Sequence, residues 1–137
     1  MNPHILIVDD DWAIRSAISF ALNRTGFRVT EAPNGEEALD LIRQTQGTEE
    51  SYDLLLTDLE MPRMTGAELI SALRQENIPM PTFVISANWD LAVIDELIDQ
   101  GGCLDFIKKP FELEKLVYRI DQALTDRGIM EMMEMTR

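Results

Sequence analysis

The sequence has few of the features that mark secreted, membrane-spanning or nucleic-acid-binding proteins. Cys103 is its single cysteine, so no disulfide can form within the chain, which suits a reducing compartment. No apolar run approaches the roughly 20 residues of a membrane span, and no charged leader with a long apolar region precedes the first strand-like segment. We therefore expect a cytoplasmic protein that does not contact the membrane.

Basic residues are also scarce. The 137 residues include 12 lysines and arginines and 25 acids, which gives a formal net charge of -13. Proteins that hold nucleic acid neutralise its phosphates with basic side chains, so we expect no direct contact with nucleic acid. Solubility explains most of the acids. Acids that crowd at the end of a strand need another explanation, because they repel one another unless a cation lies among them.

Hydrophobic periodicity predicts five strands that alternate with five helices in one α/β domain. The expected strands are 4–8, 27–31, 54–58, 82–86 and 104–107, and the expected helices are 12–23, 34–44, 66–75, 90–100 and 111–124. Short connections and right-handed crossovers then give a doubly wound parallel sheet with helices on both faces. We choose the flavodoxin-like strand order 2-1-3-4-5, because it places the first and third strands side by side.

The last residues differ in composition from the rest of the chain. We assign residues 1–124 to the domain and residues 125–137 to a Met-rich tail or the start of a linker, because Gly128 is expected to break the last helix. A Met-rich contact surface, or a helix that continues into a partner, is the alternative. The methionines concerned are Met130, Met132, Met133 and Met135.

Charged residues stand at the carboxyl ends of three predicted strands. They are Asp9, Asp10 and Asp11 after the first strand, Asp58 at the end of the third, and Lys108 and Lys109 after the fifth. In open α/β sheets this edge is where ligands bind. Carboxylate oxygens suit magnesium, and a lysine suits the oxygens of a transferring phosphoryl group. The sequence therefore predicts an acidic, cation-binding pocket in which Asp58 accepts a phosphoryl group.

Simpler roles exist for several of these residues. Three adjacent aspartates also suit the start of a helix, where they cap it and oppose its macrodipole. Lys108 suits a solvated surface position better than a site. Ser86, at the end of the fourth strand, either offers a hydroxyl donor to the same edge or merely ends the strand. The peptide bond before Pro110 is a candidate for the cis form, which would aim Lys109 inward.

Four short motifs give the chain a family resemblance. It resembles a receiver domain of the two-component response regulators over residues 4–124. The motifs are Val8-Asp9-Asp10, Asp58-Leu59-Glu60-Met61-Pro62-Arg63-Met64-Thr65-Gly66, Ser86-Ala87 and Lys109-Pro110-Phe111. Each motif alone is common, but their order and spacing together are specific to that family.

The resemblance implies a role for each residue at the strand ends. Asp58 would be the phosphoacceptor, and Asp9, Asp10 and Asp58 would hold magnesium, or manganese in its place, with Asp10 bound directly and Asp9 directly or through water. Glu60 would contribute its backbone carbonyl to the metal. Lys109 would pair with the acceptor carboxylate and then with the phosphoryl oxygens.

The resemblance also implies a switch and a set of partners. Ser86 would move to bond the phosphoryl group, and Phe106 would turn inward, although it lacks the hydroxyl of a tyrosine. The donor would be the phosphohistidine of a sensor histidine kinase or of a histidine phosphotransfer protein. An output partner or domain would read the change. The chain would assist its own phosphorylation and dephosphorylation without being an enzyme on a separate substrate.

Two other functions stay open. The first is a small magnesium-dependent phosphohydrolase with an aspartyl nucleophile, since Glu60 lies two positions after Asp58, as the general acid does in haloacid-dehalogenase-like hydrolases. There, however, the nucleophile strand comes first in the chain, and 137 residues leave little room for a substrate cap. The second is a degenerate receiver that only binds partners, which the complete set of expected residue types disfavours.

Overall fold

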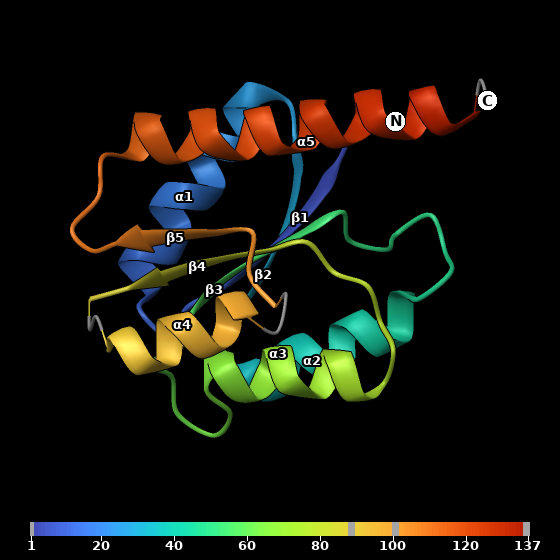
Figure 1. Ribbon diagram of the computed structural model, residues 1–137. Coiled ribbons are helices and arrows are strands. Elements are labelled where there is room, and N and C mark those ends of the chain that lie inside the picture. Colours follow the sequence, from blue (N-terminus) through green and yellow to red (C-terminus); the bar gives the residue numbers. More distant parts are fainter. Residues whose placement is uncertain (1, 88–89, 100–101, 136–137) are drawn as a thin grey trace.

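Strands and helices alternate along the chain as the periodicity predicts (Figure 1). The computed structural model describes residues 2–87, 90–99 and 102–135. The strands are β1 (His4–Val8), β2 (Arg28–Ala32), β3 (Leu54–Asp58), β4 (Thr82–Ser86) and β5 (Asp105–Lys108). The helices are α1 (Trp12–Thr25), α2 (Gly35–Thr45), α3 (Gly66–Gln75), α4 (Leu91–Asp99) and α5 (Leu113–Met135).

The strands form one parallel sheet in the order β2-β1-β3-β4-β5, which confirms the predicted topology. Helices α1 and α5 cover one face, and α2, α3 and α4 cover the other (Figure 1). The predicted elements match the observed ones to within two residues at each boundary, except at the end of α5. Gln100, the last residue of the predicted fourth helix, lies outside the described residues. None of the described helices is both long enough and apolar enough to span a membrane.

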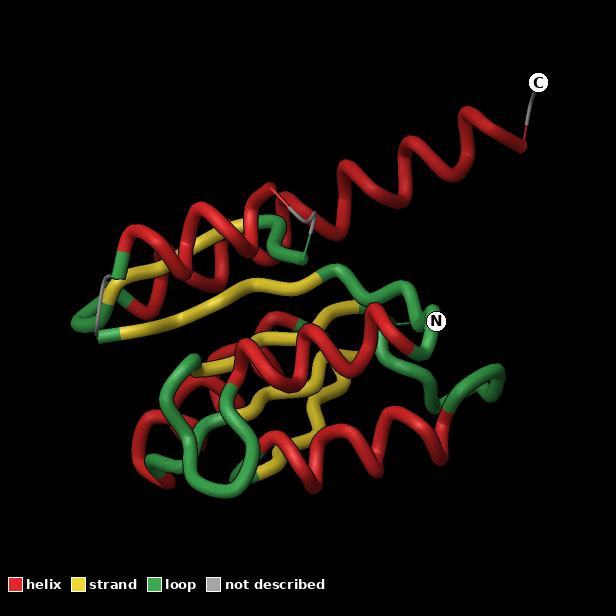
Figure 2. The backbone as a smooth tube through the Cα atoms, turned by 60° about the horizontal axis from the view of Figure 1, so that its bottom comes forward, coloured by secondary structure: helices red, strands yellow, loops and turns green. Residues whose placement is uncertain are grey.

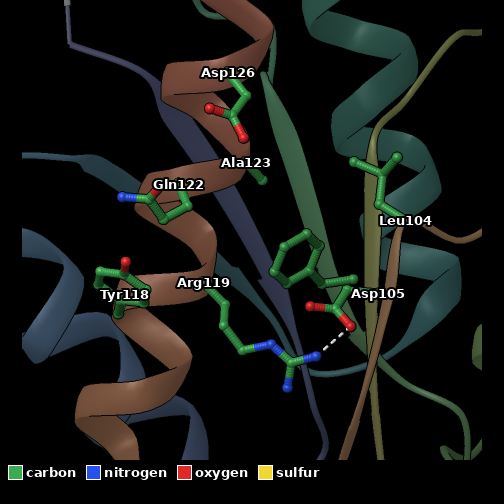
Figure 3. Close-up of a pocket in the computed structure, with 8 residues that line it drawn as sticks. Leu104, Asp105, Tyr118, Arg119, Gln122, Ala123 and Asp126 are labelled. Carbon is green, nitrogen blue, oxygen red and sulfur yellow. Dashed lines mark hydrogen bonds and ion pairs between the residues drawn. The ribbon is translucent and has the colours of Figure 1, made fainter.

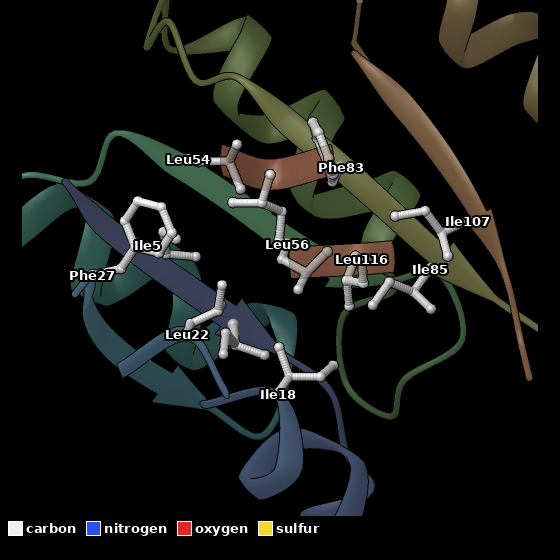
Figure 4. Close-up of a cluster of buried hydrophobic side chains, with 12 residues drawn as sticks. Ile5, Ile18, Leu22, Phe27, Leu54, Leu56, Phe83, Ile85, Ile107 and Leu116 are labelled. Carbon is white, nitrogen blue, oxygen red and sulfur yellow. The ribbon is translucent and has the colours of Figure 1, made fainter. Parts of the chain in front are cut away.

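Two apolar layers sandwich the sheet because successive side chains of a strand point to opposite faces. In β1, Ile5 and Ile7 join the layer under α1 and α5, whereas Leu6 and Val8 join the layer over α2 and α3. Figure 4 shows the first layer, which is closed by side chains of both covering helices. Since both faces of the central strands are buried, β1, β3 and β4 read in the sequence as nearly continuous apolar runs.

The second strand begins one residue later than predicted, because Phe27 takes part in the C-terminal cap of α1. Gly26 takes a left-handed backbone (φ 103°) and donates its N–H to Asn23, while the Phe27 N–H bonds the Leu22 carbonyl at 3.1 Å. This is the usual glycine-terminated end of a helix, with an apolar residue after the glycine packed on the last turns. Phe27 is therefore buried as part of the helix end, not as a strand residue.

The fifth strand is also displaced by one residue. Leu104 is 58% exposed, and its N–H bonds the Thr82 carbonyl just before the strand begins at Asp105. An apolar residue at the entry to an edge strand has no covering element on its outer side. The prediction placed Leu104 in the strand because the residue is hydrophobic, but the strand begins at Asp105.

The prediction that Gly128 breaks the last helix is wrong. Helix α5 runs unbroken to Met135, and Figures 1 and 2 both show it continuing past the end of the sheet. A glycine inside a helix costs only about 1 kcal/mol relative to alanine. It ends a helix when it takes the left-handed conformation, which Gly128 does not do.

The loop after β3 is held tightly against the start of α3. Thr65 and Glu68 form a reciprocal capping box, and Gly66 donates its N–H to the Leu59 carbonyl at 3.0 Å. A Cβ atom on Gly66 would overlap the carbonyl oxygen of Asp58. Only glycine lets the helix begin this close to the end of the strand.

Gly66→Ala should therefore lower the free energy of unfolding by about 3 kcal/mol, because backbone rather than a movable side chain must shift. Gly102→Ala is the matched control, since its added methyl would come too close only to the Ile70 side chain, at 2.8 Å, and would meet backbone at an ordinary contact distance, 3.6 Å from the Leu97 carbonyl oxygen. Urea unfolding monitored by circular dichroism measures both variants. Equal losses in the two would contradict the backbone overlap at Gly66.

Candidate functional site

Three strand ends bring their charged residues to one edge of the sheet. The register pairs Val8 with Thr57, so Asp9 and Asp58 end neighbouring strands. It also pairs Asp58 with Ile85 and Ser86 with Lys108. Lys109 directly follows β5, and its long side chain reaches the ends of β1 and β3.

Asp58 is almost fully buried, and both of its carboxylate oxygens are engaged. One oxygen accepts the Glu60 backbone N–H at 3.1 Å, and the other accepts Lys109 Nζ at 2.8 Å. The first contact comes from the loop that folds back after the strand. The second comes from the far side of the sheet edge, so the carboxylate is fixed from two directions.

Asp9 is equally buried, and it is bonded through both its side chain and its backbone. Its carboxylate accepts the Asp11 N–H at 2.8 Å and Lys109 Nζ at 3.0 Å, and its own N–H bonds the Ala32 carbonyl at 3.2 Å. Asp11 is also the N-cap of α1, with its side chain bonded to the N–H groups of Ala13 and Ile14. Helix capping thus accounts for the presence of an acid at Asp11, but it does not account for the buried carboxylate of Asp9.

Lys109 is the cation shared by the two buried carboxylates. Burial of its ammonium is the largest single influence and lowers the pKa, but the hydrogen bonds to Asp58 and Asp9 and the charges of those carboxylates together outweigh burial and raise the pKa above its ordinary 10.5. The Lys109–Pro110 peptide bond is cis, as anticipated. The backbone N–H of Lys109 bonds the Ser86 carbonyl at 2.9 Å and ties the lysine to the end of β4.

Asp10 completes a cluster that suits a divalent cation. One carboxylate oxygen from each of Asp9, Asp10 and Asp58 lies within 4.8 Å of the others, and of the three residues only Asp10 is exposed. One lysine cannot neutralise three carboxylates, and oxygen donors of this kind are those that hard divalent cations prefer. The donor set therefore fits such an ion.

The remaining predicted residues lie near this edge in different ways. Ser86 is fully buried at the end of β4, on the same sheet face as Val84. Phe106, opposite Val84 on β5, is partly buried and packs with the apolar cluster beneath α4. Glu60 is exposed in the loop after Asp58, and its N–H is bonded to the Asp58 carboxylate.

One contributor was missed by the sequence reasoning. Arg15, on the second turn of α1, donates through Nη1 to the backbone carbonyl of Asp9 at 2.7 Å and through Nε to Glu31 at 3.0 Å. Charge patterning within helices does not reveal it, because its partners lie in other elements. The available signal was a basic residue one turn into a helix that directly follows three acids.

Comparison with known proteins agrees with this geometry. A family model described as the response regulator receiver domain matches residues 5–121. The chain belongs to this family. Receiver domains are signalling domains of two-component systems and interact with histidine kinases and output domains.

Two relatives differ in the fraction of their own length that this chain matches. The chain is 37% identical over 123 residues to a cyclic di-GMP phosphodiesterase of Thermotoga maritima, spanning 90% of the chain and 31% of that protein. It is 32% identical to sporulation initiation phosphotransferase F of Bacillus subtilis, spanning 85% of the chain and 89% of that protein. The chain thus spans about a third of the first relative and nearly the whole of the second.

Among solved structures, the receiver domain of the Francisella response regulator 1452 superimposes with a TM-score of 0.80 at 32% identity. The match covers 93% of this chain and 99% of that one. FixJ-N superimposes with a TM-score of 0.76 at 31% identity, over 91% of this chain and 95% of that one. Both likenesses support the same sheet order and helix arrangement.

The ion pairs at this site generate a prediction about stability. Without divalent cations, Lys109→Met should lower the free energy of unfolding at neutral pH by about 2 kcal/mol, because two buried carboxylates lose their counter-charge. Since the folded-state pKa of Lys109 is raised above 10.5, this contribution is complete below pH 10.5 and is lost as the pH rises through the folded pKa. Urea titrations from neutral to strongly alkaline pH measure the difference.

Lys115→Met is the matched control for this titration. Lys115 forms an exposed pair with Glu112, so its loss should change stability by less than about 0.5 kcal/mol at any pH. Equal stabilities of the wild type and the Lys109→Met variant at neutral pH would contradict the role assigned to the shared ammonium.

Proposed function

We propose that this receiver domain accepts a phosphoryl group on Asp58 from a phosphohistidine, in a reaction that needs magnesium, and thereby regulates a partner. The contact between Asp58 and Lys109 Nζ at 2.8 Å, inside a cluster of three carboxylates, carries the proposal. It combines a nucleophile, a cation for phosphoryl oxygens and a place for a metal at one edge. The donor is a sensor histidine kinase or a histidine phosphotransfer protein.

The chemistry is a displacement at phosphorus. A carboxylate oxygen of Asp58 forms the new P–O bond while the P–N bond to the histidine breaks, and the departing imidazole nitrogen keeps the electron pair. Lys109, already bonded to that carboxylate, transfers its hydrogen bonding to the phosphoryl oxygens. The Glu60 N–H holds the second carboxylate oxygen and keeps the nucleophile oriented. Water later hydrolyses the acyl phosphate and returns Asp58.

Magnesium, when bound, would neutralise charge on the transferring phosphoryl oxygens. Asp10 would hold it directly, Asp9 directly or through water, and Asp58 and the Glu60 carbonyl would complete the protein ligands. Manganese, which takes the same oxygen ligands, is the expected substitute. The clustering of three carboxylate oxygens within 4.8 Å supports this assignment.

We interpret the chain as a signalling phosphoacceptor and not as an enzyme that turns over a separate substrate. The competing hydrolase would need Glu60 as a general acid. Glu60 instead lies exposed after the strand, and its backbone N–H is bonded to the nucleophile itself. The nucleophile is on the third strand of the chain and not on the first.

Ser86 and Phe106 are the proposed switch. They lie on the same sheet face of neighbouring strands, since Val84 is paired with Phe106 and Ser86 with Lys108. Phe106 is only partly buried against the cluster beneath α4, so a deeper position would bury more of its ring. Movement of the Ser86 hydroxyl toward a phosphoryl group would be coupled to that change.

The output partner is expected on the face formed by α4, β5 and α5, and the kinase near α1. Figure 3 shows a groove on that output face, between β5 and α5, beside the ion pair of Arg119 and Asp105. Leu104 and Tyr118 line it and are mostly exposed. Residues 1–124 remain the proposed domain, and residues 125–137, through which α5 continues as far as Met135, remain the proposed Met-rich tail or start of a linker.

Intact mass after incubation with magnesium and phosphoramidate, which carries the same P–N bond as phosphohistidine, tests the proposal. The wild type should gain one phosphoryl group, and Asp58→Asn or a sample with chelator should gain none. Asp40→Asn, an exposed acid on α2, is the matched control and should behave as wild type.

Two results would contradict the phosphoacceptor function. Sustained hydrolysis of phosphoramidate with no adduct, under quenching fast enough to trap an acyl phosphate, would favour the hydrolase. No adduct and no hydrolysis, with magnesium bound, would favour a domain that only binds partners.

A further inference from the structure

The Asp9–Asp10 peptide group is held by Arg15. Its carbonyl, that of Asp9, accepts Arg15 Nη1 at 2.7 Å, while the same guanidinium pairs with Glu31 on β2 at 3.0 Å. The Arg15 side chain is 13% exposed, so the guanidinium lies largely out of water, whereas its partner Glu31 is an exposed residue with 36% of its side chain accessible. A planar guanidinium can span two acceptors in fixed directions, which a single ammonium cannot.

This contact matters because it acts on the exposed ligand. The buried carboxylate of Asp9 has two other anchors, the Asp11 N–H and Lys109. Asp10 is exposed, and its carboxylate is placed by the peptide group that joins it to Asp9. Rotation of that peptide would swing the Asp10 side chain away from the other two carboxylates. The hydrogen bond from Arg15 to the Asp9 carbonyl opposes this rotation.

We propose that Arg15 is a positioning residue for the divalent cation, acting through the Asp9–Asp10 peptide and anchored by Glu31. The inference rests on the proposed function, because it concerns the same metal-dependent site. Arg15 does not touch the reacting atoms. Its effect is to keep three carboxylate oxygens convergent before the ion arrives, so that binding does not have to order them.

Electrostatics alone predicts that removal of Arg15 strengthens magnesium binding, whereas a positioning role predicts that it weakens binding. Arg15 is a positive charge beside a cation site, so its removal on Coulombic grounds would tighten magnesium binding, and the Glu31 carboxylate left without its counter-charge would tighten it further. Positioning predicts weaker binding, since outer contacts that orient metal ligands commonly change metal affinity by roughly ten- to a hundredfold. The sign of the change therefore separates the two explanations.

Magnesium titration by calorimetry, at constant ionic strength, measures this sign. Arg15→Ala should raise the magnesium dissociation constant about tenfold, and Arg15→Lys, which keeps the charge and one donor group, should raise it by less. Arg43→Ala is the matched control, because Arg43 is an exposed arginine that also pairs with a glutamate, Glu76. It should leave the constant unchanged. Thermal unfolding without magnesium checks that each variant is folded.

A second readout distinguishes positioning from general damage. At saturating magnesium, phosphorylation of Arg15→Ala by phosphoramidate should return toward the wild-type rate, because the nucleophile and Lys109 keep their own contacts. Unchanged or tighter magnesium binding in a folded Arg15→Ala protein would overturn the inference. Should that variant not fold, unchanged binding in Arg15→Lys would overturn it.

Failure of the proposed function would look different. A wild type that binds magnesium but takes up no phosphoryl group would refute phosphotransfer, while the binding constants still decide the role of Arg15. A wild type that binds no magnesium would refute both.

Discussion

The structure depends on one electrostatic constraint, the crowding of three carboxylates at the edge of a sheet with a single lysine among them. Lys109 bonds the two buried carboxylates, at 3.0 and 2.8 Å, and leaves the cluster with excess negative charge. That excess would be unfavourable in a protein selected only for stability. Under the proposed function the excess becomes useful, because a divalent cation and then a phosphoryl group would each be held by charges that the fold already keeps in place.

The parallel sheet makes this crowding possible. Parallel strands end at the same edge of the sheet, so the residues at the ends of β1, β3 and β5 meet although they are far apart in the chain. The local backbone then completes the arrangement. Gly66 lets α3 begin against Asp58, and the Asp11 cap begins α1 directly after Asp9 and Asp10. The clustering of charged residues at this edge is thus a product of topology and of two tight helix starts.

Much of this was predictable because strands buried on both faces and capped helices leave strong local patterns. The strands themselves and the clustering of Asp9, Asp10, Asp58 and Lys109 were predicted correctly from them. The strand order does not follow from such patterns. It was chosen because it places the first and third strands side by side, and the structure confirms it. Features that depend on tertiary contacts were not predicted. Phe27 belongs to a helix end, Gly128 stays helical, and Arg15 bonds a carbonyl and an acid from other elements. Hydrophobicity and residue type do not encode such partners.

The most direct test of this account is a crystal structure with manganese, whose anomalous scattering locates the ion without reference to a functional assay. The account predicts one strong anomalous peak at the sheet edge, within about 2.2 Å of oxygens from Asp10 and Asp58 and close to Asp9, the distance expected for a small hard cation. Lys109 should remain beside Asp58. A peak elsewhere, or none at saturating manganese with the three carboxylates turned apart, would contradict the central claim.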